Sequence, residues 1–468
     1  MTKPHKPRTD TNQKAPRANQ PAAPFVRTEP AAAPEPTEQG RKTRREPAPP
    51  ARGAKPGLAG PGVTINRRAA DRLRGGHLWV YASDIEQIEV GARETPHLLP
   101  VADSRGLLLG TALYSPSSQI ALRVVAREAV DDAAWLKLLE TRLVNAIGER
   151  MPMLRSEKMK SDSCRLCFSE ADEIPGLVID KYGPLVIVQR LVKGLYADGV
   201  REVCVRVLRK LLQPATILER PDPRIRELEG LDAPDLAPWW AKNAAEPVTS
   251  TQFHLNGLVF HFDANSGQKT GAFLDQSANY ATTRDWAERL GAVGRALDVC
   301  TYQGGFALHL ARVCKSVTGI DSSRASLEVA ERNLEANRKT ILGEVDWVEA
   351  DAFQILRGWS DAREQFDAIV LDPPAFAKSK RAVEGALRGY KELNLRAMQM
   401  LRPRGLLVTC SCSHHVSWVD LEGAVASAAA DAHRRVRLLE RRGAAPDHPV
   451  VLNLPETEYL KCLVLQVD

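Results

Sequence analysis

Apolar runs of strand length recur along the C-terminal half of the chain and alternate with helical patterns. Five of these runs are RALDVC, KSVTGID, VDWVEA, FDAIVLD and RGLLVTC, which begin at positions 295, 315, 345, 366 and 404. The stretch SSRASLEVAERNLEANR (322–338) places apolar residues at helical spacing. Strands that alternate with helices predict a parallel sheet with helices on both faces. Two more strands are expected at 434–442 and 459–467.

The region before this pattern divides into two smaller units. Residues 63–130 contain short alternating runs interrupted by Gly75-Gly76 and by Pro116, which predicts a small β-rich domain. Residues 131–150 carry apolar side chains at three- and four-residue spacing, which predicts a helix leading into the next unit. These apolar positions are Trp135, Leu138, Leu139, Leu143 and Ile147.

The second unit, residues 131–259, is predicted to be a small α+β domain. Two strand-like runs within 174–191 flank the turn Tyr182-Gly183-Pro184, and a helix at 200–212 precedes a strand at 215–220. The expected fold class is therefore α/β, with a Rossmann-like domain at 260–468 that follows a β-rich domain and an α+β domain.

The first 62 residues differ in composition from the rest. Residues 1–60 contain twelve prolines, and 12 Lys/Arg against 5 Asp/Glu, so this segment carries +7 in a chain of net charge +6. Large apolar side chains are almost absent from it, so we expect residues 1–62 to be disordered. Such a basic tail either strengthens nucleic-acid binding without reading sequence or only solubilises the chain.

The composition favours a cytoplasmic protein of two or three packed domains, given 468 residues of which 44% are apolar. The chain has no apolar run of about 18 residues that would cross a membrane, and MTKPHKPRTD lacks the apolar core of a signal peptide. Eight scattered cysteines fit reduced thiols better than disulfides.

Acidic residues stand near the ends of the first three strands of the predicted sheet, where open α/β folds bind ligands. Asp298 is followed by the pair Gly304-Gly305, and Asp321, 23 residues after Asp298, is placed to accept hydrogen bonds from ribose hydroxyls. Asp351 precedes Ala352 and Phe353, which are suited to an adenine edge and ring. A single Asp would be explained as a helix cap, but three at successive strand ends favour a nucleoside site. The adjacent glycines do not form G-x-G-x-x-G, so a cofactor without phosphates is favoured.

The fourth strand ends in LDPPAF (371–376), where Pro373 and Pro374 fix the turn after Asp372 and Phe376 is able to stack on a flat ring. The fifth strand ends in TCSCSHH (409–415).

The residue types in TCSCSHH would also suit a metal. Zinc ligands normally come as separated pairs, however, and the C-x-x-C at 164–167 has no evident partner pair, so no metal is expected. Cys410 is interpreted as a buried, unreactive thiol, and His414 and His415 as the beginning of the following helical region.

The motifs LDVCTYQGGF, GIDSS, DAF and LDPPAFAKSK, in this order, resemble those of class I S-adenosylmethionine-dependent methyltransferases. Ser411-Cys412-Ser413 is similar to the Ser-Cys-Ser motif of bacterial 23S ribosomal RNA (cytosine-C5) methyltransferases of the large-subunit type I family. GGHLWVY and YSPSSQI resemble the PUA RNA-binding domain of that family, CFSEADEIPGLVIDKYG its central domain, and NSGQKTGAFLDQ its cofactor-covering segment. The resemblance covers nearly all of residues 63–468.

This resemblance implies that S-adenosylmethionine is the cofactor and that 23S ribosomal RNA, or a large-subunit precursor, is the partner. It implies that Cys412 adds to carbon 6 of cytosine, while Asp372 bonds the base edge and favours protonation at ring nitrogen 3.

The residues that the resemblance assigns to the cofactor are Asp298, Tyr302, Gly304, Asp321, Asp351, Ala352, Asp372, Gln268, Thr270, Phe273, Asp275 and Gln276. Those assigned to the substrate are Pro373, Pro374, Phe376, Lys269 and Lys378. Further phosphate contacts are expected among Arg67, Arg68, Arg72, Arg74, His77, Lys380 and Arg381, although solvated surface charge explains any one of them.

Other readings stay open at this point. Related RNA cytosine methyltransferases place a second cysteine where this chain has Ala375, so the base that removes the carbon-5 proton is unassigned. Amino-nitrogen methylation of adenine or guanine also uses an acid-Pro-Pro-aromatic turn and needs no cysteine. A non-catalytic RNA-binding assembly factor is a third interpretation. The oligomeric state is undetermined, a homodimer included.

Overall fold

The computed structural model describes residues 61–90, 97–157, 160–232, 234–265 and 271–468. The tail expected at 1–62 lies outside this part of the chain, apart from its last two positions, and so do Gln268, Lys269 and Thr270. None of the described helices has both the length and the apolar character needed to cross a membrane.

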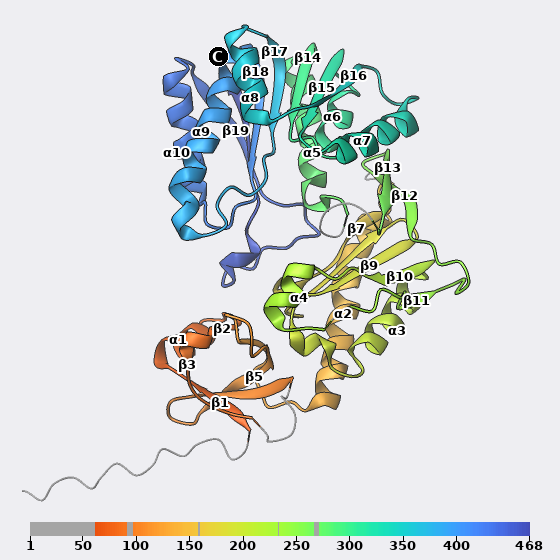
Figure 1. The fold of residues 1–468 in the computed structure, drawn as a ribbon, viewed down its shortest axis with the longest axis vertical. Helices are drawn as coiled ribbons and strands as arrows, with labels where there is room; N and C mark the ends of the chain where they lie inside the picture. Colours follow the sequence, from red (N-terminus) through yellow and green to blue (C-terminus); the bar gives the residue numbers. More distant parts are fainter. Residues whose placement is uncertain (1–60, 91–96, 158–159, 233, 266–270) are drawn as a thin grey trace, which may run out of the picture. The chain divides into compact units, whose positions relative to one another are not determined.

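The first domain is a six-stranded sheet in the order β2-β6-β5-β4-β1-β3 (Figure 1). Its helix α1 begins after Asn66, whose side chain accepts a hydrogen bond from the Ala69 backbone N–H at 2.9 Å and so caps the helix. The elements are β1 (Gly62–Ile65), α1 (Arg67–Arg74), β2 (Trp79–Val80), β3 (Ile85–Glu89), β4 (Leu98–Asp103), β5 (Leu108–Tyr114) and β6 (Leu122–Ala126).

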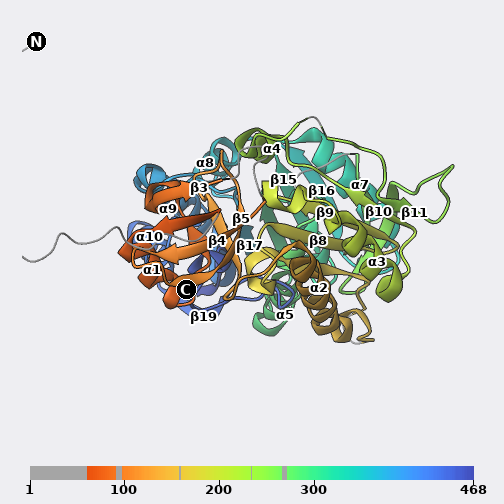
Figure 2. The ribbon, with the colours of Figure 1, turned by 90° about the horizontal axis from the view of Figure 1, so that it is seen from below.

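The second domain is a five-stranded sheet in the order β11-β10-β9-β8-β7, covered by α2 and α3, which lie side by side (Figures 1 and 2). Trp135, Leu139, Leu143 and Ile147 are fully buried in its core, as the helical spacing predicts. The elements are α2 (Asp132–Leu154), β7 (Ser163–Phe168), β8 (Leu177–Tyr182), β9 (Leu185–Arg190), α3 (Val200–Leu212), β10 (Thr216–Glu219), α4 (Pro223–Glu229) and β11 (Trp240–Ala241).

A hairpin of β12 (Ser250–Leu255) and β13 (Leu258–Asp263) leads into the third domain, so β13 runs across the expected boundary at 259/260. Its aromatic side chains share a core with both neighbouring domains. Phe262 stacks on Tyr182 of β8 with ring centroids 4.2 Å apart, which anchors the hairpin to the second sheet.

The third domain is a seven-stranded sheet in the order β16-β15-β14-β17-β18-β20-β19. The strands β14 to β18 are parallel, while β20 is antiparallel to β18 and to β19. Helices α5, α6 and α7 pack on one face and α8, α9 and α10 on the other, as predicted. The strands are β14 (Arg295–Val299), β15 (Ser316–Asp321), β16 (Glu344–Glu349), β17 (Phe366–Leu371), β18 (Leu401–Ser411), β19 (Val436–Arg442) and β20 (Lys461–Val467). The helices are α5 (Ser277–Leu290), α6 (Gly305–Leu310), α7 (Arg324–Asn337), α8 (Ala352–Asp361), α9 (Val383–Met400) and α10 (Trp418–Asp431).

Candidate active site

The carboxyl ends of the parallel strands meet at one edge of the third sheet (Figure 1). Val299 at the end of β14 is in register with Ile320 of β15 and Leu371 of β17, and Leu371 is in register with Thr409 of β18. The segments that follow these four strands therefore leave the sheet at the same edge, where ligands of open α/β sheets bind.

Asp298 lies beneath the first of these segments. Its Oδ2 accepts hydrogen bonds from Thr301 Oγ1 at 2.5 Å and from the Ala307 N–H at 2.8 Å, and the residue is fully buried. Its Oδ1 is also buried and has no partner within the part of the chain that the structure describes. Burial raises the pKa of this carboxyl to about 7, even though both hydrogen bonds favour the charged form. Asp298 thus shapes the loop and leaves one oxygen able to accept a hydrogen bond.

Gly304 and Gly305 follow in this loop. Gly304 has φ +85° and precedes α6, while a Cβ on Gly305 would lie 2.5 Å from the Tyr280 ring. The glycine pair therefore gives a left-handed turn and lets α6 pack closely against α5.

Asp321 ends β15 and holds the same loop in place. Its Oδ2 accepts the Tyr302 N–H at 2.9 Å and its Oδ1 accepts the Ser323 N–H at 2.9 Å. Each carboxylate oxygen has a second lone pair, so these bonds do not exhaust the group. Asp351 is exposed and caps α8 by accepting the Gln354 N–H at 2.9 Å. The helix-cap explanation thus describes Asp351 and one bond of Asp298, which accepts from Ala307 in the first turn of α6, but not Asp321.

Asp372, directly after β17, is oriented by a chain of buried amides. Gln276 Nε2 donates to Asp372 Oδ2 at 3.1 Å, and Gln276 Oε1 accepts from Asn279 Nδ2 at 2.7 Å. Arg442 Nε in turn donates to Asn279 Oδ1 at 2.9 Å. Gln276 and Asn279 are both almost fully buried, so the network holds the carboxylate in a single orientation.

Aromatic rings line the segment after Asp372. Phe376 is half-buried, with its ring centroid 5.8 Å from that of Phe353 and 5.0 Å from that of Tyr390. Pro373 is buried, whereas Pro374 and Lys378 are exposed. The cluster joins the position expected for adenine to the position expected for the target base.

Cys412 is half-buried and directly follows the last residue of β18. The residues on either side of Cys412 both bond to Tyr390 of α9. Ser411 Oγ donates to the Tyr390 hydroxyl at 2.8 Å, and Ser413 Oγ lies 3.2 Å from the same hydroxyl. Burial raises the pKa of Tyr390, while the hydrogen bonds with Ser411 and Ser413 oppose that shift. The Tyr390 hydroxyl therefore contacts both residues that flank Cys412.

Cys410 differs from Cys412 in its surroundings. It is fully buried in the core that contains α5 and is in register with Cys462 of β20. A hydrogen bond with Cys462 and burial raise the pKa of this thiol well above its usual range. His414 and His415 are exposed in the turn before α10, which begins only at Trp418, so they do not belong to the helix.

The cover of the site comes partly from residues before α5. Tyr302 donates from its hydroxyl to the Gly271 carbonyl at 3.0 Å, and its ring lies 5.0 Å from that of Phe273. Asp275 accepts a hydrogen bond from the Tyr459 hydroxyl. This segment therefore ties the loop after β14 to the region before β20.

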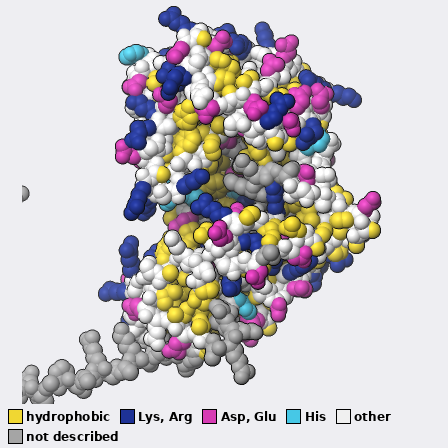
Figure 3. Space-filling model, viewed as in Figure 1, with side chains coloured by type: hydrophobic (Ala, Val, Ile, Leu, Met, Phe, Trp, Pro, Cys, Tyr) yellow, Lys and Arg dark blue, Asp and Glu magenta, His cyan; other side chains and the backbone are white. Residues whose placement is uncertain are grey.

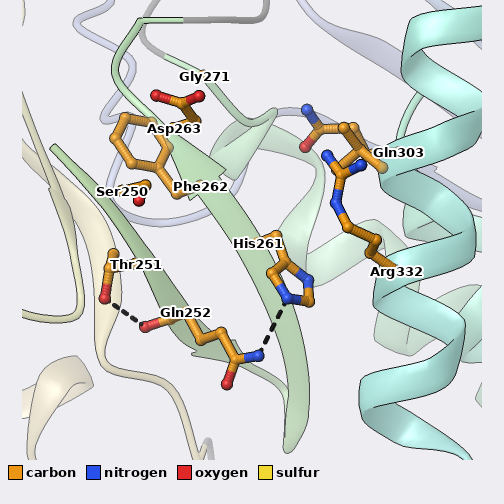
Figure 4. A pocket seen from close by; sticks show the side chains of 10 residues that line it. Ser250, Thr251, Gln252, His261, Phe262, Asp263, Gly271, Gln303 and Arg332 are labelled. Carbon is orange, nitrogen blue, oxygen red and sulfur yellow. Dashed lines mark hydrogen bonds between the residues drawn. The ribbon is translucent and has the colours of Figure 1, made fainter.

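A separate hollow of about 350 Å³ lies between the β12–β13 hairpin and α7 (Figure 4). Gln303 and Arg332 reach it from the side of α7, and Gln252 Nε2 lies 3.0 Å from His261 Nε2. Among the described residues its lining contains none of Asp321, Asp372 and Cys412, so it is separate from these three side chains.

Three of the expected phosphate contacts in the first domain have partners within the protein. Arg72 pairs with Asp84 at 2.5 Å, Arg74 pairs with Asp103 at 2.5 Å, and the buried His77 bonds Glu456 at 3.2 Å. These three side chains hold the protein together, so they are poor candidates for RNA contacts. The exposed candidates are Arg67, Arg68, Lys378, Lys380 and Arg381. Figure 3 shows Lys and Arg side chains mixed with Asp and Glu on that face, rather than in one block.

Several residues at the site carry no motif of their own: Asn279, Tyr390, Arg442, Tyr459 and Lys461. A signal existed for Lys461, because a lysine inside the apolar run YLKCLVLQV is unusual for a buried strand. The others sit in ordinary helical, strand or loop sequence and are identified only by the contacts they make.

The residues at the strand ends fit a nucleoside cofactor. Asp321 offers a carboxylate for ribose hydroxyls, and Ala352 and Phe353 offer a backbone and a ring beside Asp351. The unpartnered Asp298 Oδ1 is suited to a hydrogen-bond donor of the ligand. A nucleoside cofactor without phosphates does not require a glycine-rich loop, and these residues do not form one.

Comparisons with known proteins agree with this geometry. Residues 63–127 match the model of a PUA-like domain, and residues 199–464 match that of the S-adenosylmethionine-dependent methyltransferases. The chain is 36% identical to Ribosomal RNA large subunit methyltransferase I of Pseudoalteromonas translucida, over 84% of this chain and 96% of that protein. It is 35% identical to the protein of the same name from Klebsiella pneumoniae, over 84% and 94%. A solved S-adenosylmethionine-dependent methyltransferase from Streptococcus mutans shares the fold with a TM-score of 0.70 at 18% identity, over 86% of this chain and 99% of that one. A methyltransferase solved in complex with SAH gives a TM-score of 0.71 at 18% identity, with the same coverage.

Proposed function

This chain belongs to the S-adenosylmethionine-dependent methyltransferase family, as a relative of the ribosomal RNA large subunit methyltransferases I, and from that premise we propose that it methylates carbon 5 of a cytosine in 23S ribosomal RNA. S-adenosylmethionine is the methyl donor, and ribosomal RNA of the large subunit is the class of substrate. The observation that carries the proposal is the half-buried Cys412 at the edge of the sheet where Asp321 and Asp372 also lie.

The cofactor supplies an electrophilic methyl group on a sulfonium. Asp321 and Asp351, with Ala352 and Phe353, are proposed to hold its nucleoside part, and the loop shaped by Asp298 its amino-acid part. Tyr302, Gly304, Phe273 and Gln276 complete this set, and Gln268 and Thr270 stay in it as predictions that lie outside the described residues. Asp372 closes the cofactor site toward the target base.

Cys412 is proposed to act as the nucleophile, because carbon 5 of cytosine is itself a weak nucleophile. The thiolate forms a bond to carbon 6, while Asp372 bonds the base edge and favours a proton at nitrogen 3. The electron pair released toward carbon 5 would take the methyl group of the bound cofactor, whose sulfur–methyl bond would break and leave its electron pair on sulfur. A base removes the carbon-5 proton, the carbon 6–sulfur bond breaks, and its electron pair returns to sulfur.

The amide network beneath Asp372 supports this role. The bond from Gln276 Nε2 fixes one oxygen of the Asp372 carboxylate. The carboxylate is therefore already oriented when the base binds. Phe376, with Pro373 and Pro374, is proposed to line the pocket for the flipped-out cytosine.

The PUA-like domain is proposed to bind RNA. Arg67 and Arg68 are exposed there, and Lys378 is exposed just past the catalytic turn, so these are the proposed phosphate contacts, together with Lys269 outside the described residues. Such contacts position the RNA without reading its sequence, and the target is selected by RNA shape and by the flipped base.

The test is a trapping experiment with RNA that contains 5-fluorocytidine. Fluorine at carbon 5 blocks the final elimination, so a covalent enzyme stays attached to the RNA under denaturing conditions when S-adenosylmethionine is present. We expect an adduct with the wild type and with Cys410→Ala, and none with Cys412→Ala.

Absence of an adduct, with cofactor and RNA binding demonstrated, would overturn the covalent mechanism and favour amino-nitrogen methylation through the Asp-Pro-Pro-Phe-like turn at 372–376. Failure to bind S-adenosylmethionine at all would favour a non-catalytic assembly factor.

A further inference from the structure

Lys461 is a lysine in an otherwise apolar strand. It begins β20 (Lys461–Val467), whose residues are all buried, and only 3% of its surface is exposed. In the antiparallel pair of β18 and β20 it is in register with Ser411, the residue before Cys412. Its side chain therefore leaves the sheet beside the catalytic segment.

The ammonium of Lys461 reaches the residue after Cys412. Its Nζ donates to the Ser413 carbonyl at 3.1 Å and to the Tyr459 carbonyl at 2.8 Å. An ammonium has three N–H donors, so one donor remains after these two bonds. The two carbonyl bonds hold the charge at the point where the chain turns away from β18.

No Asp or Glu of the described residues forms an ion pair with this ammonium, since none lies within 4.0 Å of it. Burial lowers the pKa of Lys461, while Glu458 and Cys412 oppose that shift because a negative charge on either favours the ammonium. A buried cation without an adjacent anion costs folding free energy, and an apolar residue would avoid that cost. A lysine at this position therefore lowers folding stability, and its presence needs an explanation other than stability.

We propose that the ammonium of Lys461 is the counter-ion of the Cys412 thiolate. This inference rests on the proposed function, in which Cys412 is the nucleophile, and it gives the thiolate a source of stabilisation within the fold. A cation beside a thiol favours the ionised form, which is the reactive one.

The proton of the Cys412 thiol passes to solvent when the S–H bond breaks, and Lys461 keeps its own proton. The same charge assists twice in a turnover. It stabilises the thiolate before the bond to carbon 6 forms, and it stabilises the sulfur again when that bond breaks and the electron pair returns.

Other titratable groups near the Cys412 segment include acids and two histidines, and His414 and His415 are exposed in the following turn. Tyr390 from α9, Tyr459 and Glu458 from the segment before β20, and Asp372 after β17 are acids, whose ionised forms disfavour a thiolate nearby. Removing the Lys461 charge therefore moves the titration of Cys412 upward in pH.

The test measures the thiolate directly, with neither RNA nor cofactor. The full chain is alkylated with iodoacetamide between pH 5 and 10, and the rate at the Cys412 peptide is followed by mass spectrometry. Lys461→Gln keeps a hydrogen-bond donor without the charge, and Lys461→Arg keeps the charge. The matched control is Lys181→Met, which removes another lysine whose Nζ bonds backbone carbonyls, in this case those of Asp162 and Gly183.

We expect the midpoint of the Cys412 profile to rise by one pH unit or more in Lys461→Gln, which is about a tenfold slower alkylation near neutral pH. Lys461→Arg and Lys181→Met should keep the wild-type midpoint. An unchanged midpoint in Lys461→Gln would overturn the proposal. If that variant does not fold, a raised midpoint in Lys461→Arg relative to Lys181→Met would overturn it as well.

The 5-fluorocytidine adduct separates this proposal from the function. A raised midpoint in Lys461→Gln without any wild-type adduct would leave the Lys461–Cys412 pairing in place and remove the cytosine mechanism. A wild-type adduct together with an unchanged midpoint in Lys461→Gln would support the cytosine mechanism and remove the Lys461–Cys412 pairing.

Discussion

Gln276 Nε2 donates a hydrogen bond to Asp372 Oδ2 at 3.1 Å, although the two residues are 96 positions apart in the chain. One residue belongs to the segment before α5 and the other follows β17. A motif expected to cover the cofactor therefore also orients the carboxylate expected to meet the base. This contact makes the orientation of the Asp372 carboxylate depend on the segment before α5.

Gln276→Leu should slow methyl transfer with little effect on the fold. The change removes the donor to Asp372 and the acceptor for Asn279, so the carboxylate loses its fixed orientation. We expect kcat to fall by about ten- to a hundredfold, with a smaller change in KM for RNA, measured with radiolabelled methyl donor. Gln252→Leu, at an exposed amide bonded to His261, is the control and should keep the wild-type kcat. Equal kcat values in the two variants would remove the orienting role.

Asp298→Asn should change how stability depends on pH. The pKa of Asp298 is raised to about 7 in the fold, so between about pH 4 and 7 the unfolded chain loses a proton that the native chain retains. This carboxyl therefore lowers stability as pH rises through that range, by roughly 2–4 kcal/mol in all.

The asparagine has no such titration and keeps an oxygen that accepts from Thr301 and Ala307. We expect the free energy of unfolding of Asp298→Asn, measured by urea titration, to increase relative to that of the wild type as the pH rises from 4.5 to 7.5. Asp346→Asn, at an exposed position of β16, is the control. A constant difference between Asp298→Asn and wild type across this range would contradict the assignment.

Tyr390→Phe tests the contribution of the hydroxyl separately from that of the ring. The ring keeps its contact with Phe376 at 5.0 Å, but the bonds to Ser411 and Ser413 on either side of Cys412 are lost. We expect a loss of about 1 kcal/mol in stability and a larger, more than tenfold loss in the rate of adduct formation with 5-fluorocytidine RNA. Tyr196→Phe, which removes a hydroxyl bonded to Glu219 in the second domain, should lose only stability.

Arg68→Ala and Arg74→Ala should affect different properties. Arg68 is exposed, so its loss should weaken RNA binding about equally for all sequences. The slope of the binding constant against salt concentration should fall by the amount expected for about one phosphate contact, and Tm should not change. Arg74 pairs with the buried Asp103, so its loss should lower Tm by several degrees. Fluorescence anisotropy against salt and thermal melts measure the two effects. A lowered Tm in Arg68→Ala, or a reduced salt slope in Arg74→Ala without a lowered Tm, would reverse the assignment.

The parallel strands of the third domain were predictable because their apolar runs are clear, and the runs at 295, 315, 345 and 366 correspond to β14 to β17. In the second domain, the helix predicted at 200–212 coincides with α3. The antiparallel direction of β20 was not predictable, because an apolar run carries no information on which neighbours it joins.

Sequence predicts which residues follow the strands, and the structure places Asp321, Asp372 and Cys412 at one edge of the sheet. The site was not predictable where partners come from distant segments. Arg72 and Arg74 read as surface cations, yet Asp84 and Asp103 neutralise them in the fold. Asn279 and Arg442 have no motif, and only the path of the chain brings them together beneath Gln276. Sequence patterns therefore predict which residues follow the strands better than they predict the distant residues that contact them.

The position of β20 between β18 and β19 has a consequence for biosynthesis. The ribosome makes Cys412 well before Lys461, so for a period the nascent chain carries the thiol without the strand that lies beside it. During that period β18 has an open edge, and the buried ammonium is not yet available. The enzyme should therefore acquire its reactive thiolate only when β20 has inserted, which delays covalent chemistry on RNA until the domain is assembled.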